Sequence, residues 1–514
     1  MTTGRSPWRR TCAVDGLTAG IGGLAVASLG AIALDGVGAV GGEAMPLAAV
    51  GSAFVDRTPL WLKTLAVQAF GTSDKTALWI GMALVILAVL AGIGALARTR
   101  HTLALVCLGA LGALVVAAVV TREGARVTDV LPTLVGVTGA ILWLHGRARG
   151  ASSAEAGDED PVAATRRAVL RLGAATAGFA ATSWWWARGT GPTLDDVRDQ
   201  IVLPAPVSSE PDVTAADLRT PGAVPWQVPT GDFYRIDTAL IVPQVDPATW
   251  RLRVHGEVEQ EVELTWADLL RQPLIERWVT LACVSNEVGG DLVGNALWLG
   301  WPVRELLAMA RPRSGADMVL SRSVDGWTAG TPLEALTDDR NALLAIGMNR
   351  QPLMPQHGFP VRLVVPGLYG YVSATKWVTE LKVTRFAVDM GYWTPRGWSA
   401  FGPVKTASRI DVPRSGREVR AGVVPVAGVA WAMHRGIAAV QVSIDGGPWR
   451  DARLAGQPTV DAWRQWVFDW DATTGSHTIT VRAQDGLGEW QPEKVTRSDP
   501  DGATGHHTVT VRVA

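Results

Sequence analysis

The sequence has few cysteines, few charged residues and no excess of basic residues. Its 514 residues include three cysteines, too few to cross-link a disulfide-rich scaffold. Lys and Arg number 47 against 48 Asp and Glu, so there is no surplus of positive charge for a nucleic-acid backbone. Charged residues make up 18%, below the roughly 25% of ordinary soluble domains. These shortages exclude a disulfide-stapled module and argue against nucleic acid as a partner.

Long uncharged runs account for the low charge, and they lie before residue 190. A bilayer core requires about 20 apolar residues per helix. The sequence therefore predicts an N-terminal α-helical membrane bundle over 1–187, surrounded by membrane lipid, with about five transmembrane helices: 16–34, 76–97, 102–121, 130–145 and 172–187. Almost no ionisable residue falls inside these runs, so a transport path is not expected.

Arginines gather in alternate connections between the apolar runs, and such clusters mark cytoplasmic connections. The residues are Arg5, Arg9, Arg10, Arg98, Arg100, Arg147, Arg149, Arg166 and Arg167. Five spans then place the chain after residue 187 on the extracytoplasmic side of a multi-pass cell-membrane protein. The run from Thr165 to Arg171 also resembles an internal twin-arginine export signal; its alternative is a plain cytoplasmic anchor.

The remainder of the chain has the composition of soluble domains. Residues 188–225, with an excess of Pro, Asp and Ser, are predicted to be a linker. Residues 226–415 mix short strands and helices, with Thr265 as a helix N-cap. Residues 420–514 show several short alternating strands, which favours an all-β sandwich.

Cys283 is the cysteine in the predicted exported part, and it ends an apolar run before Gly289 and Gly290. A lone cysteine is usually a small buried apolar side chain. A thiolate at a strand end can also hold a soft metal ion. Neither a CxxC pair nor a His pair accompanies it, so zinc and iron–sulfur sites lack ligands. Spacing alone leaves both interpretations of Cys283 open.

The segments around Cys283 resemble the sulfite oxidase-type molybdopterin-dependent oxidoreductases, in a membrane-anchored bacterial form. The matching segments are 233–235, 294–303, 348–353, 357–367 and 376–378. The run from His357 to Gly367 is the most specific of them. The resemblance covers about 226–514 and implies an α+β molybdopterin-binding oxidoreductase domain followed by an immunoglobulin-like domain of dimerisation type.

The resemblance also implies a molybdenum–molybdopterin cofactor, with Cys283 as the single protein ligand of the metal. The cofactor-binding residues it implies are Phe233, Tyr234, Arg235, Cys283, Ser285, Asn286, His357, Arg362 and Lys376. A pterin phosphate is an anion, for which Arg362, Lys376 and His357 are suitable donors. Arg235 would place positive charge near an oxo group or an anionic substrate.

Two departures from the family pattern concern the substrate. Glu287 stands where those enzymes carry an arginine after the cysteine, and a carboxylate repels the sulfite dianion. Trp398 stands in place of the family's catalytic tyrosine, and an indole offers no O–H group. We therefore expect Cys283, Arg235 and Trp398 at the catalytic centre, but not sulfite as the substrate.

The expected function is oxygen-atom transfer to or from a small-molecule substrate. An external cytochrome or membrane redox protein would exchange the electrons, and homodimerisation through the β-domain stays open. His101 and His145 could hold a haem at the cytoplasmic face, although polar residues at helix ends are usually interfacial. The alternative is a metal-free surface binding or structural protein on the same scaffold.

Overall fold

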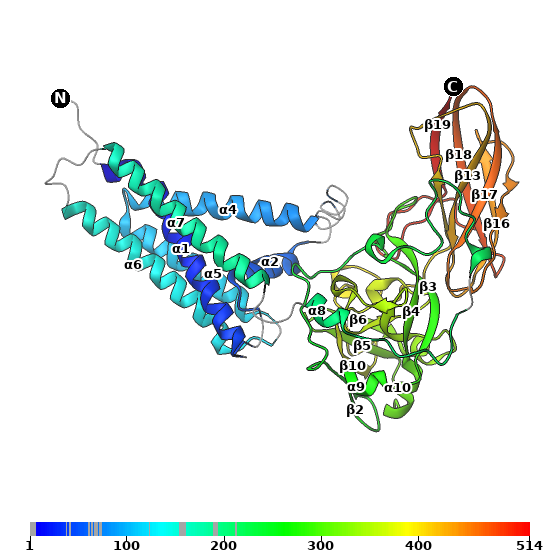
Figure 1. Ribbon diagram of the computed structural model, residues 1–514, viewed down its shortest axis with the longest axis horizontal. Helices are drawn as coiled ribbons and strands as arrows, with labels where there is room; N and C mark the ends of the chain where they lie inside the picture. The colour runs from blue at the N-terminus through cyan, green and yellow to red at the C-terminus, as the bar shows by residue number, and fades with distance from the viewer. Residues whose placement is uncertain are drawn as a thin grey trace. The chain divides into compact units, whose positions relative to one another are not determined.

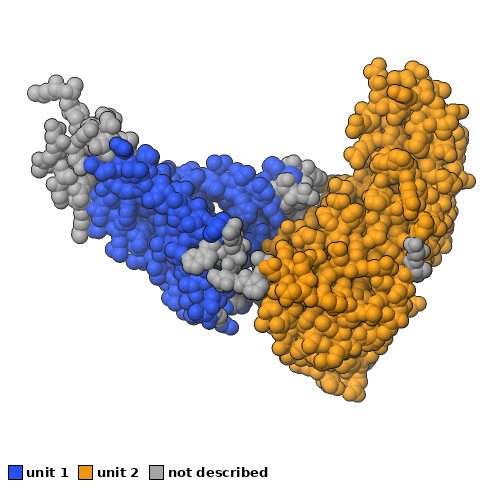
Figure 2. Space-filling model, in the orientation of Figure 1, with its two compact units in different colours: residues 1–193, 238–241 blue, residues 194–237, 242–514 orange. Residues whose placement is uncertain are grey.

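The chain is divided into two compact units. The computed structural model describes residues 7–37, 39–40, 43–59, 62, 65, 70, 74–122, 124–153, 161–188, 194–210 and 213–514. One unit comprises 1–193 with 238–241, and the other comprises 194–237 with 242–514 (Figure 2). Arg5, the acidic stretch 154–160 and the linker residues 189–193 and 211–212 lie outside the described residues.

The first unit is helical (Figure 1). Its α-helices are α1 (Pro7–Gly36), α2 (Pro46–Arg57), α4 (Asp74–Ala97), α5 (His101–Val120), α6 (Leu131–Ser153) and α7 (Pro161–Arg188). Four stretches of the described residues are long and apolar enough to cross a membrane: Ala13–Gly36, Lys75–Ala97, His101–Val120 and Val127–Arg147. The fifth predicted segment is helical as α7 but is not one of these four, because arginines and tryptophans make it less apolar. Helix α2, short and amphipathic, was not predicted.

Buried polar contacts collect at one end of the helical bundle. Asp15 of α1 is 1% exposed. Its Oδ1 lies 3.5 Å from Nε of Arg147 in α6 and 3.6 Å from Nη1 of Arg171 in α7. Nε2 of His101, at the start of α5, lies 3.2 Å from Nδ1 of His145 in α6. The beginnings of α1, α5 and α7 therefore meet the end of α6.

The direct contact between His101 and His145 bears on the haem expectation. Iron bound by both rings would have to stand between the two nitrogens, and a hydrogen-bonding distance of 3.2 Å leaves no room for it. The rings are instead stacked, with centroids 5.4 Å apart. As placed, the pair joins α5 to α6 and does not form a haem site.

Two sheets build the first part of the second unit. One has the order β2-β1-β10-β5-β6, from β1 (Arg251–Gly256), β2 (Val262–Thr265), β5 (Met318–Ser323), β6 (Thr328–Pro332) and β10 (Val378–Thr384). The other has the order β3-β4-β7-β8, with β9 paired to β7, from β3 (Ile275–Ala282), β4 (Val293–Pro302), β7 (Leu343–Met348), β8 (Gln351–Pro352) and β9 (Arg362–Val364). The short helices are α8 (Leu194–Asp199), α9 (Trp266–Leu270), α10 (Val303–Ala310) and α11 (Leu333–Thr337). Thr265 caps α9 as predicted, because its hydroxyl accepts the Asp268 N–H at 3.1 Å.

The C-terminal part consists of β-strands in two further sheets (Figure 1). The first has the order β11-β13-β17-β16, from β11 (Ala407–Val412), β13 (Gly422–Trp431), β16 (Arg453–Leu454) and β17 (Arg464–Ala472). The second has the order β12-β19-β18-β14-β15, from β12 (Glu418–Val419), β14 (Ile437–Ile444), β15 (Arg450–Asp451), β18 (Gly475–Asp485) and β19 (His507–Val513). Both sheets contribute to one apolar core that includes Trp466, Trp470, Ile479 and Val511. The β-region starts at Ala407, earlier than the predicted boundary at 420.

The predicted linker is packed onto the second unit over much of its length. Arg198 donates through Nε to the carbonyl oxygens of Pro352 and Leu353 at 3.2 and 3.1 Å. Ser208 forms a parallel bridge with Ile275, beside β3. The composition of 188–225 suggested an extended tether; its described part from 194 onward is an extended segment fixed by these hydrogen bonds.

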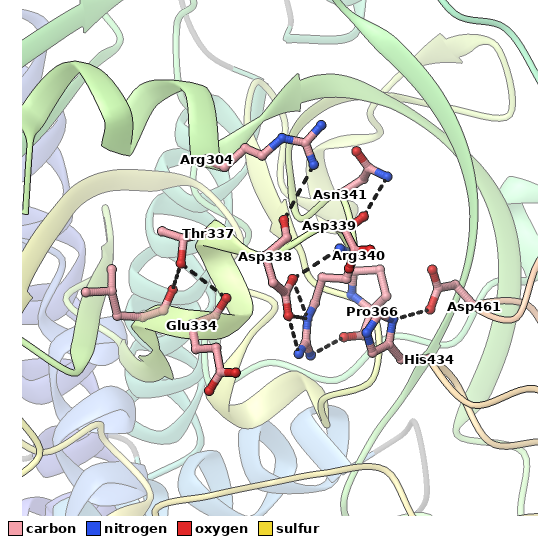
Figure 3. Close-up of polar contacts among 11 residues, drawn as sticks. Arg304, Glu334, Thr337, Asp338, Asp339, Arg340, Asn341, Pro366, His434 and Asp461 are labelled. Atoms are coloured by element: carbon pink, nitrogen blue, oxygen red, sulfur yellow. Dashed lines mark hydrogen bonds and ion pairs between the residues drawn. The ribbon is translucent and has the colours of Figure 1, made fainter. Parts of the chain in front are cut away.

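Polar contacts gather around the loop before β7 and, separately, between two residues of the C-terminal part (Figure 3). Arg340 pairs with Asp338 at 2.7 Å and donates to the Pro366 carbonyl at 3.2 Å. Nearby, His434 Nδ1 lies 3.4 Å from Asp461 Oδ1. The Asp461 carboxylate raises the pKa of His434, while partial burial and the Arg340 charge oppose it and Asp338 supports it.

This contact predicts a pH-dependent stability. A raised folded-state pKa means that the His434 contribution is fully present below the unfolded pKa of about 6.5. The contribution is lost as the pH rises through the folded value. We expect the denaturant midpoint of the solubilised protein to fall between pH 6 and 8, with a smaller fall in a His434→Gln variant. Equal pH dependence in parent and variant would contradict this assignment.

Candidate functional site

Cys283 follows directly on β3, in a short loop that leads into β4. The loop is closed by its own backbone, since the Cys283 N–H donates to Leu292 O at 2.9 Å. Asn286 completes the closure by accepting the Leu292 N–H on Oδ1 at 2.8 Å. Through this bond Asn286 helps to fix the loop that carries the thiol. Burial raises the pKa of the Cys283 thiol, whereas hydrogen bonds from Ser285 and the charge of Lys376 lower it.

Two buried cations are linked to Cys283: Lys376 acts on the thiol, and Arg362 acts on Lys376. Arg362 on β9 is 4% exposed, and it donates to the carbonyl oxygens of His357, Leu363 and Ala374. Burial lowers the pKa of Arg362 to about 10. Lys376, 9% exposed, precedes β10, and burial lowers its pKa to about 8 although Asp237 opposes the shift. Both side chains keep a positive charge at neutral pH.

Asp237 links the second cation to Arg235. Its Oδ2 lies 2.8 Å from Lys376 Nζ and 3.0 Å from Arg235 Nε. The Asp237 side chain is 7% exposed and that of Arg235 is 34% exposed. Asp237 follows Arg235 by two residues, so one short segment supplies both a cation and its partner. Sequence reasoning singled out Arg235 but missed the carboxylate.

The ring of His357, predicted as a donor to the pterin phosphate, contacts the backbone. Its ring is 2% exposed, and Nε2 lies 3.0 Å from the Thr230 carbonyl oxygen, so Nε2 carries the proton. Burial, together with Lys376 and Arg362, lowers the pKa of His357 to about 3. The imidazole is therefore neutral. It packs edge-on against the ring of Phe233 at 5.8 Å.

Phe233 and Tyr234 form the aromatic wall of this group. The Phe233 ring stacks on Tyr234 at 5.2 Å and meets Trp298 edge-on at 5.8 Å. Gly294 makes room for it, because a Cβ there would lie 2.8 Å from the Phe233 ring. Burial raises the pKa of Tyr234, so its phenol keeps its proton.

Trp398 is buried at 7% exposure and packs against Tyr371, with ring centroids 5.8 Å apart. Within the described residues its indole N–H has no hydrogen-bond partner. A second phenol, that of Tyr369, interacts electrostatically with the Cys283 thiol. Burial raises the pKa of Tyr369 to about 12, and Cys283 is among the groups that contribute. Sequence reasoning missed Tyr369, because no spacing rule connects it with Cys283.

The group as a whole fits an anionic ligand. Arg362 is a fully enclosed guanidinium whose hydrogen-bond partners within the described chain are neutral carbonyl oxygens. The Asp237 carboxylate contacts Lys376 and Arg235 and acts electrostatically on Arg362, while His357 is neutral. A buried surplus of positive charge is costly unless an anion offsets it. A phosphate-bearing cofactor placed beside the Cys283 thiol would do so.

The described side chains do not provide a complete metal site. No group of three or more His, Cys, Asp or Glu residues lies close enough to hold a metal ion in the described part of the chain. A metal at Cys283 must therefore arrive with ligands of its own. A soft thiolate beside a cradle for an anionic organic group matches a metal that is bound through a cofactor.

Comparisons with known proteins identify the family of this chain. The family described as "Oxidoreductase molybdopterin binding domain" matches residues 239–393. Human mitochondrial sulfite oxidase is 31% identical over 305 residues, which cover 50% of this chain and 56% of the human protein. The oxidoreductase YuiH of Bacillus subtilis is 30% identical over 178 residues, covering 35% of this chain and 86% of YuiH. The chain thus spans about half the length of the sulfite oxidases it matches.

A solved structure agrees with the sequence comparisons. The sulfane dehydrogenase SoxCD of Paracoccus pantotrophus superposes with a TM-score of 0.50 at 25% identity, over 56% of this chain and 81% of that one. The thiol of Cys283, the buried cations and these matches all point to one cofactor, molybdenum–molybdopterin. The chain belongs to the molybdopterin-binding oxidoreductase family that includes sulfite oxidase.

Proposed function

We propose that this chain is a membrane-anchored, extracytoplasmic oxidoreductase that transfers an oxygen atom to or from a small substrate other than sulfite. The observation that carries the proposal is the electrostatic link between the Cys283 thiol and the buried cation Lys376, which lies among the further cations Arg362 and Arg235. When bound, the molybdenum cofactor supplies oxygen-atom transfer with a two-electron change at the metal. An external one-electron carrier, a cytochrome or membrane redox protein, would exchange these electrons in two steps.

The residues have separable roles in this proposal. Cys283 holds the metal, and the closed loop through Asn286 fixes its direction. Arg362 and Lys376 neutralise the phosphate of the cofactor, while Phe233 and Tyr234 form the wall beside it. Arg235, the most exposed of the three cations, offers a hydrogen-bond donor at the edge of the group. We place Trp398 in the packing around the reaction site and not in proton transfer.

The proposed extracytoplasmic location of the second unit rests on which helix ends lie together in the first unit. Asp15 gathers Arg147 and Arg171, and the contact of His101 with His145 brings the Arg98–Arg100 connection to the same end. If α7 is counted as a fifth span, the arginine-rich connections share one side, which favours a cytoplasmic position. The second unit would then be exported. A reporter fused after Arg188 tests this: alkaline phosphatase should be active and a cytoplasmic reporter inactive.

The C-terminal sheets support a further part of the proposal. Two β-sheets that share the core of Trp466 and Trp470 are compatible with an immunoglobulin-like domain and with a homodimer. Sedimentation of the solubilised protein would separate monomer from dimer.

The decisive experiment measures metal and activity together. We expect about one molybdenum and one pterin per chain after expression in a cofactor-competent host. We also expect dye-linked turnover of an oxygen-atom donor or acceptor. A folded, metal-free protein from such a host would refute the proposal and favour the metal-free binding protein.

A further inference from the structure

A small cavity lies beside the loop that carries Cys283. Its volume is about 20 Å³, room for roughly one water-sized group. Ala282 and Asn286, which flank Cys283 in the chain, line one side. Tyr369, Gln491 and Thr504 contribute to the rest, so the C-terminal β-region helps to close it. A substrate would bring a single reacting atom or small group into this space.

Tyr369 is among the residues that line this cavity. Its side chain is 6% exposed, and its oxygen accepts the Lys405 N–H at 3.4 Å. Within the described residues, no hydrogen bond uses the phenol proton as a donor. Gly502 creates the space for the phenol: a Cβ there would lie 2.6 Å from the Tyr369 oxygen. A glycine in this position keeps an O–H group available to a ligand.

Glu287 is the charged residue among those that line the cavity. Its carboxylate accepts the Ser498 O–H at 3.1 Å, which fixes it to the loop before β19. Two cations of the C-terminal part are already paired with other carboxylates. Lys405 is held by Asp501 at 2.8 Å, and Arg409 is held by Asp411 at 2.7 Å. An anion that approached this cavity would meet a negative charge.

We propose that this cavity receives the reacting group of the substrate, that Tyr369 donates its O–H to the substrate oxygen, and that Glu287 rejects anions. The substrate is therefore an uncharged oxygen-atom donor or acceptor. This inference rests on the proposed function. The Tyr369 phenol supplies the hydrogen bond that Trp398 cannot give, from a different segment of the chain. The reduction of such a donor takes up two electrons from the carrier and two protons from solvent, and it releases the oxygen as water.

The charge argument is tested by binding, without turnover. Sulfate serves as a non-reacting dianion, and its affinity for the full-length solubilised holoprotein is measured from the sulfate-dependent shift of the melting temperature. We expect Glu287→Arg to bind sulfate at least about tenfold more tightly than the parent, because a repulsive charge becomes attractive. Glu287→Gln should fall between them. Equal sulfate affinity in all three proteins would overturn the role of Glu287.

The role of Tyr369 is tested with Tyr369→Phe, which removes only the oxygen. With dimethyl sulfoxide as the uncharged oxygen donor and a reduced viologen dye, we expect kcat to fall about 10- to 100-fold with KM little changed. Tyr371→Phe is the matched control: its phenol donates to the Ser399 carbonyl at 2.8 Å, and kcat should stay close to that of the parent. An unchanged kcat in Tyr369→Phe would contradict its role as a donor.

The molybdenum content of the parent distinguishes a failure of this inference from a failure of the proposed function. A parent without molybdenum refutes the proposed function, while the sulfate experiment still reads the charge of the cavity. A loaded parent that turns over sulfite but not dimethyl sulfoxide keeps the enzyme assignment and overturns the uncharged substrate class.

Discussion

Replacing Cys283 by serine is expected to lower turnover at least about a thousandfold, which corresponds to about 4 kcal/mol in the activation free energy. A serine hydroxyl is a hard, weakly acidic donor, whereas a thiolate is the soft ligand that tunes such a metal. The change is nearly isosteric, and the closure of the loop by Asn286 and Leu292 does not use the sulfur. The fold should therefore be retained.

Pterin content and the metal signal are expected to respond differently to Cys283→Ser. Arg362 and Lys376 are unaltered, so pterin content should stay near that of the parent while the metal–sulfur absorption changes or molybdenum is lost. Cys107→Ser, in helix α5, provides a matched control and should leave turnover unchanged. Full activity in Cys283→Ser would contradict the proposal that Cys283 is the metal ligand.

Asp237→Asn is expected to destabilise the cofactor-free protein by about 3 kcal/mol. The Asp237 carboxylate contacts Lys376 at 2.8 Å and Arg235 at 3.0 Å, and the side chains of Asp237 and Lys376 are 7% and 10% exposed. Removal of one partner leaves a buried cation without its counter-charge, which typically costs about 3–5 kcal/mol. The pKa of Lys376 should fall further, because Asp237 is the group that raises it.

Bound cofactor is expected to restore part of the stability that Asp237→Asn loses. Its phosphate brings negative charge to Lys376 and Arg362, so the denaturant midpoint of the loaded variant should lie closer to that of the loaded parent. Asp411→Asn is the matched control, since Asp411 pairs with Arg409 at 2.7 Å and both side chains are 10% exposed. The control should lose similar stability with and without cofactor. A loaded Asp237→Asn protein that is as destabilised as the unloaded one would place the phosphate elsewhere.

Much of the architecture was predictable because local signals are strong there. Uncharged runs predicted four helices that are apolar enough to span a membrane. The helix after Thr265 was predicted from a capping side chain that does make its hydrogen bond. The boundary at 420 was wrong because β11 precedes it by sequence but pairs with β13 in the C-terminal sheet. Strand pairing of that kind is a long-range property.

The candidate site was predictable in its residue types but not in its charge states. Short motifs singled out Cys283, Arg362 and Lys376, and in the structure Lys376 acts electrostatically on both the Cys283 thiol and the Arg362 group. His357 was predicted as a donor to the pterin phosphate, and burial beside two cations makes its ring neutral. A sequence lists ionisable groups but does not state how deeply each is buried, and burial determines their protonation.

The sequence by itself determined that this protein has a membrane-type helical part, an oxidoreductase domain of known family and a single candidate thiol for a metal. These features depend on composition and on short runs of neighbouring residues. Only the tertiary structure decided that Asp237 partners Lys376, that Tyr369 and Glu287 share a cavity beside Cys283, and that Gly502 leaves room for the phenol. These contacts join segments that are far apart in the chain, and only the folded packing of sheets and loops brings them together.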